Sequence, residues 1–312
     1  FFFIGSTIGK VSQTKVECAT NQQINAVVPY AQNVNDFVYS VLEKYSTNIS
    51  EIAGNHAVPI INKKLFSLEK IYIPKLPEQQ KIANCLSSLD HLIDAEIQEL
   101  NTIKDHKAGL LQNLFPVGEE TVPKYRFAEF EGDGNWESFY LTDIADNLDS
   151  KRVPITSKDR LKGQIPYYGA SGIIDYVQNY IFDDNLLCVS EDGANLIDRV
   201  YPIAFSVSGK SWINNHAHVL KFNNVFTQVL VQSYLNSISL EQYLTGVAQP
   251  KLNKAKLNSI SIPLPRVEEQ KKIAECLSSL DNFIQAKDEK IKTLKEHKQG
   301  LMQQLFPVMG DK

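Results

Sequence analysis

The sequence predicts an α+β protein in which two mixed, β-rich domains, the first of them truncated, are joined by two long helices that form an antiparallel coiled coil. Three observations lead to this prediction. A segment of 45 residues occurs twice, each copy carries an apolar heptad, and the residues between the copies alternate strand-like runs with turns. The 312 residues, 43% hydrophobic and 22% charged, are ordinary for a globular protein.

The repeat aligns residues 73–117 with residues 264–308 without a gap, and 25 of the 45 positions are identical. The best-matched stretches are residues 81–90 and 272–281, and both copies end in Leu-Phe-Pro-Val. A repeat this long and this widely separated indicates a duplicated module rather than a solenoid of short units.

Each copy is predicted to be one long helix, over residues 78–117 and 263–308. Pro74 and Pro77 lead into the first helix and Pro263 and Pro265 into the second. Pro116 and Pro307 end the helices, as expected of a residue that cannot continue one. Glu78 and Glu269 place a negative charge in the first turn, which suits the helix dipole. About 37 residues at ~1.5 Å each give a helix of about 55 Å.

The apolar spacing of both helices alternates between three and four residues, which predicts a coiled-coil seam. Eight of ten seam positions are apolar in each copy. Parallel pairing would set Lys107 beside Lys298, whereas antiparallel pairing separates them and keeps Glu96 near Lys287. We therefore expect an antiparallel pair with Glu96 and Lys287 fixing its register. The seam positions are Ile82, Leu86, Leu89, Ile93, Glu96, Leu100, Ile103, Lys107, Leu110 and Leu114, then Ile273, Leu277, Leu280, Ile284, Lys287, Ile291, Leu294, Lys298, Leu301 and Leu305.

The remaining residues form globular parts. Residues 118–123 resemble a linker, and residues 124–262 a β-rich domain with helices at about 225–237 and 239–245. Residues 1–77 resemble the C-terminal part of a similar domain, since Pro59, Asn62 and Lys63 recur 191 positions later. We expect about 60 residues of that first domain to be missing, because the chain opens inside an apolar run without Met.

Motifs for catalysis are weak or absent in the sequence. The four cysteines form no Cys-x-x-Cys pair, which argues against zinc, and no apolar run approaches the ~18 residues of a membrane helix. Residues 204–211 fit a relaxed P-loop pattern, but the sequence after them is a poor helix start. His216 and His218 alternate on an expected strand, where metal ligation would need further ligands. We expect no catalysis, cofactor or metal.

The net charge of −4 counts against a simple nucleic-acid binder. Basic residues nevertheless cluster at 151–162 and 251–266. Each cluster is either a solvated surface or a contact to nucleic acid.

The layout resembles the specificity subunit of type I restriction–modification systems. The resemblance rests on residues 76–83 and 267–274, where Glu-Gln-x-Lys-Ile-Ala or its variant follows a proline-rich lead, and on the helix endings at 106–116 and 297–307. It also rests on residues 125–132, Tyr-Arg-Phe-Ala-Glu-Phe-Glu-Gly, followed by Trp136-Glu137. The match covers essentially the whole chain.

The resemblance implies a cytoplasmic protein without catalysis of its own. Two target-recognition domains would each read half of a split site in double-stranded DNA. The helices would act as spacer and as docking surface for two methyltransferase subunits, and a restriction subunit would complete the complex. The alternatives are a remnant of a fused restriction–methylation enzyme and a coiled-coil scaffold that does not bind DNA.

Candidate DNA contacts are polar and basic residues of types that read base edges or hold phosphates. Those in the second domain are Tyr168, Ser171, Lys210, Ser211, His216, Gln249, Lys251 and Asn253, and those in the first are Lys10, Gln22, Gln23 and Lys63.

Overall fold

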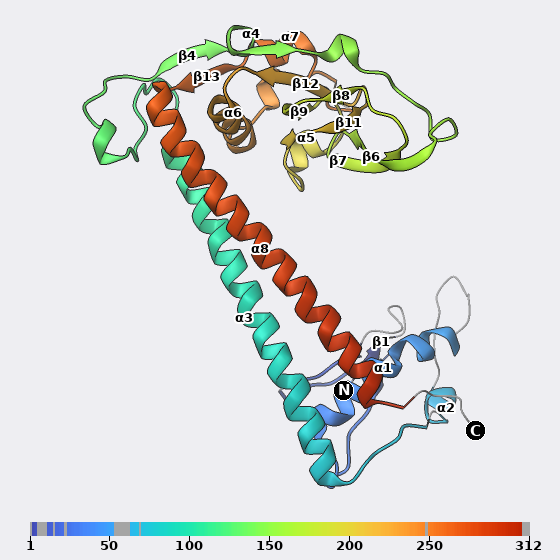
Figure 1. Ribbon diagram of the computed structural model, residues 1–312. Coiled ribbons are helices and arrows are strands. Elements are labelled where there is room, and N and C mark those ends of the chain that lie inside the picture. The colour runs from blue at the N-terminus through green and yellow to red at the C-terminus, as the bar shows by residue number, and fades with distance from the viewer. Residues whose placement is uncertain are drawn as a thin grey trace. The chain divides into compact units, whose positions relative to one another are not determined.

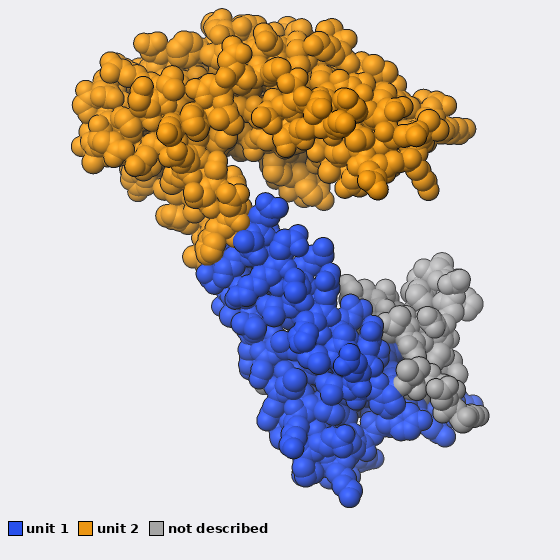
Figure 2. All heavy atoms as spheres, viewed as in Figure 1, with its two compact units in different colours: residues 1–101, 285–312 blue, residues 102–284 orange. Residues whose placement is uncertain are grey.

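The computed structural model describes the chain except residues 1, 5–10, 15, 22–23, 53–62, 69, 247–248 and 308–312. The chain divides into two compact units (Figure 2). Unit 1 comprises Phe1–Asn101 with Gln285–Lys312, and unit 2 comprises Thr102–Ile284. Among the described residues, none of the helices is both long and apolar enough to cross a membrane.

Two helices of 39 residues, α3 (Leu76–Leu114) and α8 (Val267–Leu305), correspond to the two repeat copies (Figure 1). The antiparallel coiled coil is confirmed, because residues later in α3 form ion pairs with residues earlier in α8. In unit 1, Lys298 Nζ lies 2.7 Å from Asp90 Oδ1, and Lys287 Nζ lies 2.8 Å from Glu96 Oε2. In unit 2, Lys107 pairs with Asp281.

The ion pairs explain where the two copies agree and where they differ. The 191-residue offset relates Lys107 to Lys298 and Asp90 to Asp281, so the pairs Lys107–Asp281 and Lys298–Asp90 are equivalent to each other. Glu96 faces Lys287, which is its own equivalent. A position that faces its own equivalent would bring like charges together if the two copies were identical, so complementary charges are favoured there. The hydrogen bond from Lys287 lowers the pKa of Glu96.

Unit 1 contains a small antiparallel sheet of order β2-β1-β3, with β1 (Phe2–Ile4), β2 (Val11–Ser12) and β3 (Ile24–Ala26), and the helices α1 (Asn35–Ile52) and α2 (Lys63–Phe66). The apolar face of α1 packs against both long helices. Its core residues are Phe37, Val38, Val41, Leu42, Tyr45, Ile82, Ala83, Leu86, Met302 and Phe306.

Unit 2 is β-rich, as the sequence predicted. Its sheets have the orders β10-β9-β12-β5, β7-β6-β11-β8 and β13-β4. Among the strands that the structure describes here, β6 and β11 pair in parallel and the others pair antiparallel. The strands are β4 (Glu137–Tyr140), β5 (Ala145–Asn147), β6 (Lys162–Gly169), β7 (Gly172–Val177), β8 (Phe182–Asp183), β9 (Leu186–Ser190), β10 (Ala204–Val207), β11 (Lys210–Ile213), β12 (Ala217–Phe222) and β13 (Ser261–Leu264). The helices are α4 (Leu141–Ile144), α5 (Asn195–Asp198), α6 (Val225–Ser237) and α7 (Lys254–Asn258), with single 3-10 turns η2 (Ala128–Phe130), η3 (Asp149–Lys151) and η4 (Glu241–Tyr243).

Helix α6 occupies the expected residues, capped by Asn224, whose side chain accepts from the Phe226 amide. The helix expected near 239–245 is only the turn η4, because Thr245 instead exchanges two backbone hydrogen bonds with Lys251. The P-loop pattern is excluded: residues 204–211 form β10, a turn with Gly209 at φ +71°, and the start of β11.

Both globular parts join the helices in the same way. Gln79, buried at the start of α3, donates to the Pro74 carbonyl at 2.8 Å and accepts from the Val34 amide at 3.0 Å. The equivalent Gln270 of α8 donates to the proline carbonyl five residues before it and accepts from the Thr227 hydroxyl at 2.6 Å. The glutamine of the repeated Glu-Gln pair thus ties each helix to its domain.

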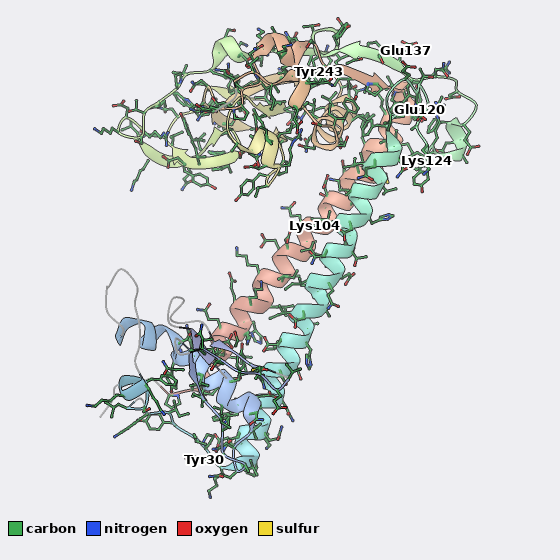
Figure 3. The ribbon with its side chains drawn as sticks, turned by 180° about the vertical axis from the view of Figure 1, so that it is seen from behind. Tyr30, Lys104, Glu120, Lys124, Glu137 and Tyr243 are labelled. Carbon is green, nitrogen blue, oxygen red and sulfur yellow. The ribbon has the colours of Figure 1, made fainter. Side chains whose placement is uncertain are left out.

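The segment between α3 and β4, where Figure 3 labels Glu120 and Lys124, folds back onto α8 within unit 2. Arg126 in this segment forms two hydrogen bonds with Glu269, of 2.9 and 2.7 Å, and its remaining terminal nitrogen donates to the Gly134 carbonyl. The side chains of Arg126 and Glu269 are 6% and 1% exposed.

Candidate nucleic-acid interface

Four segments of unit 2 meet at the turn that follows β9. The Ser190 amide bonds the Ile203 carbonyl, and the Glu191 amide bonds the His216 carbonyl. The Glu191 carbonyl accepts from the amide of Leu252 at 2.8 Å. The Ser190 hydroxyl donates to the carbonyl of residue 170, which brings the β6–β7 turn to the same place. Strand ends far apart in sequence therefore form one surface.

The exposed side chains of this surface are polar. His216 is 50% exposed, and its Nδ1 lies 2.9 Å from Oδ2 of Asp192. Lys251 is 50% exposed, and its Nζ lies 3.2 Å from Oε1 of Glu191. The Asp192 carboxylate holds the imidazole by Nδ1, so the outer nitrogen Nε2 keeps a fixed direction.

A buried ionic network supports this surface. Nδ1 of His218 lies 2.6 Å from Oδ2 of Asp149, and Nε2 lies 2.7 Å from the Leu252 carbonyl. Burial acts to raise the pKa of Asp149, but hydrogen bonds from His218 and the Val219 amide outweigh it and hold the pKa below its ordinary value. An ionised carboxylate and a carbonyl can only accept, so the two ring nitrogens of His218 lie between two acceptors.

Arg152 completes the network. Its guanidinium lies 2.7 Å from Glu191 Oε2 and donates to the Ala217 carbonyl at 2.7 Å. Burial acts to raise the pKa of Glu191, but the bond from Arg152, with His218 and Lys251, holds that pKa below its ordinary value. The charges beneath the surface are therefore compensated, and they fix the turns that carry the exposed groups.

Four predicted DNA contacts of the second domain lie at the polar surface around the turn after β9, and all four are exposed. They are Ser171, His216, Gln249 and Lys251. Tyr168 belongs to the core instead, since it is half-buried and stacks on Phe205 with ring centroids 6.0 Å apart.

The other predicted contacts lie apart or have structural roles. Asn253 caps α7 by accepting from the Lys256 amide at 3.0 Å. Lys210 lies at the opposite end of β11 from this surface, with Nζ 4.8 Å from the Tyr180 ring centroid. The prediction that Ser211 contacts DNA is not supported, because its side chain is fully buried.

In the first domain, Lys63 is exposed at the start of α2. Lys10, Gln22 and Gln23 lie outside the described residues.

Sequence reasoning missed Asp192, and it placed Arg152 in a basic cluster without its bonds to Glu191 and the Ala217 carbonyl. The available signal was the Glu-Asp-Gly turn directly after the buried strand β9, where polar groups end an apolar run. Within the part of the chain that the structure describes, no three His, Cys, Asp or Glu residues are grouped to hold a metal ion.

The fold and this surface define a modular recognition protein, in which a duplicated helical frame carries globular domains with solvent-facing polar side chains. The chain belongs to the type I restriction modification DNA specificity domain family, whose model matches residues 1–105 and 133–296.

Similar proteins include a putative type I restriction enzyme specificity subunit of Haemophilus influenzae, 36% identical over 140 residues, which are 45% of this chain and 36% of the relative. The MjaVIII specificity subunit of Methanocaldococcus jannaschii is 28% identical over 298 residues, covering 86% of this chain and 68% of the relative. The aligned part thus spans only about a third of the Haemophilus protein.

Two solved structures share the fold. The type I restriction–modification S subunit from M. genitalium has a TM-score of 0.66 at 18% identity, covering 99% of this chain and 83% of that one. A second structure, described as concerning complex assembly and conformational transition of the type I restriction–modification system, has a TM-score of 0.53 at 15% identity. The match covers 87% of this chain and 70% of that one.

Proposed function

We propose that this chain is the DNA-specificity subunit of a type I restriction–modification complex, that it recognises a bipartite site in double-stranded DNA, and that it docks two methyltransferase subunits through its helices. Residues 1–77 and 124–262 belong to two target-recognition domains, and residues 118–123 are a linker. Residues 78–117 and 263–308 are the spacer segments, which α3 and α8 largely make up. A restriction subunit completes the complex, which acts on DNA in the cytoplasm, and the chain itself catalyses no step.

The observation that carries this proposal is the contrast between the frame and the domains. The helices are identical at 25 of 45 aligned positions, whereas the globular parts have diverged. Domains that read different half-sites on a common frame need this combination, since readout depends on the side chains at the groove edges.

The surface at the end of unit 2 has the chemistry for DNA readout. Lys251 can neutralise a phosphate, and Gln249 and His216 present donors and acceptors of the kind that pair with base edges. The Asp192 carboxylate accepts hydrogen bonds, as recognition of the cytosine amino group requires.

Docking of two equal partners is supported by a stripe of outward-facing positions on the helices. Between residues 80 and 112, eight positions spaced alternately by four and three residues are exposed in α3, and seven of their eight equivalents are exposed in α8. Six of the eight carry the same residue in both copies, whereas only two of the ten other positions exposed in both copies do. The stripe comprises positions 81, 85, 88, 92, 95, 99, 102 and 106, and the ten others are 80, 84, 91, 94, 98, 101, 104, 105, 108 and 112.

The two positions that differ within the stripe do not weaken this argument. Leu92 and its equivalent Phe283 are both apolar, 41% and 47% exposed. Glu99 and its equivalent Lys290 are tied to the central ion pair of the seam at 2.7 and 2.6 Å, so their charges follow that pair. Side chains repeated on an outer face, where helix pairing does not require them, are expected if each helix binds one copy of the same partner.

The stripe is also less polar than its composition suggests. Ser88 and its equivalent Ser279 both donate their hydroxyl to the carbonyl four residues earlier, at 2.7 and 2.8 Å. Their donors are therefore satisfied within the helix, which lowers the cost of covering the surface.

Methylome sequencing tests the proposed function. A host that lacks restriction–modification activity would express the full chain with the methyltransferase subunit of its own system. We expect methylation at one motif made of two specific parts separated by a fixed gap, because the two domains read separate half-sites. Methylation at a continuous motif, or none beyond that of a host carrying the methyltransferase alone, contradicts the proposal.

A further inference from the structure

The loop of residues 193–203, which contains the single turn α5 and leads into β10, presents apolar side chains to solvent. Ile197, Val200 and Tyr201 are 51%, 72% and 60% exposed. The loop follows Asp192 directly in the chain, and it lies at the edge of unit 2 near the label α5 in Figure 1. Singly exposed apolar residues are common, but three within five positions on one short loop indicate a contact surface.

This loop is held in one conformation. The Asn195 side chain donates to the Tyr201 carbonyl at 3.0 Å and accepts from the Tyr201 amide at 2.9 Å. Between them, Arg199 adopts a left-handed conformation with φ 51°, which non-glycine residues rarely adopt. Its guanidinium donates to the carbonyls of Leu235 at 3.3 Å and Ile238 at 2.7 Å. Backbone strain that the surroundings maintain in this way is typical of functional sites.

The base of the loop is fixed to the polar surface described above. The Gly193 amide bonds the Pro250 carbonyl at 3.2 Å, and the Ser190 amide bonds the Ile203 carbonyl at 2.7 Å. Both ends of the loop are therefore fixed to the turns that carry Asp192 and Lys251.

We propose that Val200 and Tyr201 form an apolar wedge that enters a groove of the DNA bound by unit 2 and packs against an unstacked base step. This inference rests on the proposed function and adds a mode of contact to it. Apolar side chains inserted at a base step kink the duplex, and aromatic rings stack on the exposed base. A loop that is already ordered loses little conformational entropy on insertion.

The test uses the full chain in complex with its methyltransferase subunits, and a duplex carrying the methylated motif found for the wild type. 2-Aminopurine, placed in turn at each adenine of the half-site read by unit 2 except the methylated base, reports local unstacking; the methylated base is left out because a methyltransferase flips its own target from the stack. The variants are Tyr201→Ala, Tyr201→Phe, which keeps the ring, and Tyr140→Ala as a control. Tyr140 is similarly exposed, at 55%, and ends β4, on the far side of unit 2 from α5 in Figure 1.

We expect 2-aminopurine fluorescence to rise at one base step with the wild type and with Tyr201→Phe. Tyr201→Ala should lose this rise and bind the duplex roughly 5- to 150-fold more weakly, the range for one stacked base. The control should match the wild type. Equal affinity and equal fluorescence for Tyr201→Ala would overturn the inference, and so would a loss of methyltransferase binding with unchanged DNA contact, which would make the loop a protein-docking surface. If the wild type methylates no motif, the proposed function itself fails, independently of Tyr201.

Discussion

The buried pair of Arg126 and Glu269 allows a sharp test of how unit 2 is attached to α8. We consider the change Glu269→Gln, which keeps the shape of the side chain and removes its charge. The glutamine amide cannot accept both guanidinium bonds, so one hydrogen bond is lost and the charge of Arg126 stays buried without a partner. An arginine guanidinium does not lose its proton in proteins, so Arg126 stays charged in the variant.

The magnitude follows from burial. The side chains are 6% and 1% exposed, so water screens the charge very little. Breaking a buried ion pair by removing one partner costs about 3–5 kcal/mol. For a domain of about 150–250 residues, each kcal/mol lowers the melting temperature by about 2–4 °C, so we expect a decrease of roughly 6–20 °C.

The assay is thermal unfolding of the full chain followed by circular dichroism, with urea unfolding as a second measure. Two variants serve as matched controls. Glu78, the equivalent residue in α3, and the neighbouring Glu268 are both exposed, so Glu78→Gln and Glu268→Gln should each change stability by less than about 0.5 kcal/mol. The double variant Arg126→Met with Glu269→Leu should recover most of the loss, because neither buried charge remains.

A melting temperature for Glu269→Gln within about 2 °C of the wild type would refute the reasoning. A double variant as unstable as the single one would show that shape, rather than the uncompensated charge, accounts for the loss.

Three further outcomes are expected. Lys287→Glu should lower the melting temperature by placing an acid against Glu96. The added change Glu96→Lys should restore it only in part, because Glu99 and Lys290 then face like charges. Asp149 has a folded-state pKa below its unfolded value. Its contribution to stability is therefore present above about pH 4 and is lost as pH falls through the folded pKa. In urea unfolding, Asp149→Asn should remove that part of the dependence of stability on acid pH. Leu92→Glu and Phe283→Glu should each remove one methyltransferase subunit from the complex in native mass spectrometry.

Each of these outcomes can fail clearly. Unchanged stability of Lys287→Glu contradicts the role of the central pair in the register. A difference in unfolding free energy between Asp149→Asn and wild type that does not change between pH 3 and pH 7 contradicts the linkage. His91→Glu and Asn282→Glu, at exposed positions beside the stripe, are the controls. If the double variant Leu92→Glu with Phe283→Glu still binds two methyltransferase subunits, the proposed docking face is contradicted.

The long helices, their antiparallel pairing and helix α6 followed from the sequence because each depends on local information. Heptad spacing, prolines at the helix ends and the charges of Glu96 and Lys287 can be read along the chain without knowing what surrounds them. The predicted helix near 239–245 was wrong for the converse reason, since the bonds between Thr245 and Lys251 come from a neighbouring segment.

The composition of the candidate site depended on tertiary structure. Ser211, Asn253 and His216 all have side chains suited to DNA, yet one is buried, one caps a helix and one faces solvent. Whether each of these side chains is buried, caps a helix or faces solvent depends on strands and turns that come together only in the folded protein.

By itself, the sequence determined that a duplicated helical frame carries diverged domains, because periodicity and identity are properties of the chain. Only the tertiary structure decided which equivalent residues have different environments. Glu78 and Glu269 are identical in sequence, but Glu269 alone is buried, against an arginine 143 residues away. Burial and pairing set the energy of a charge, and both come from neighbours that the local sequence does not specify.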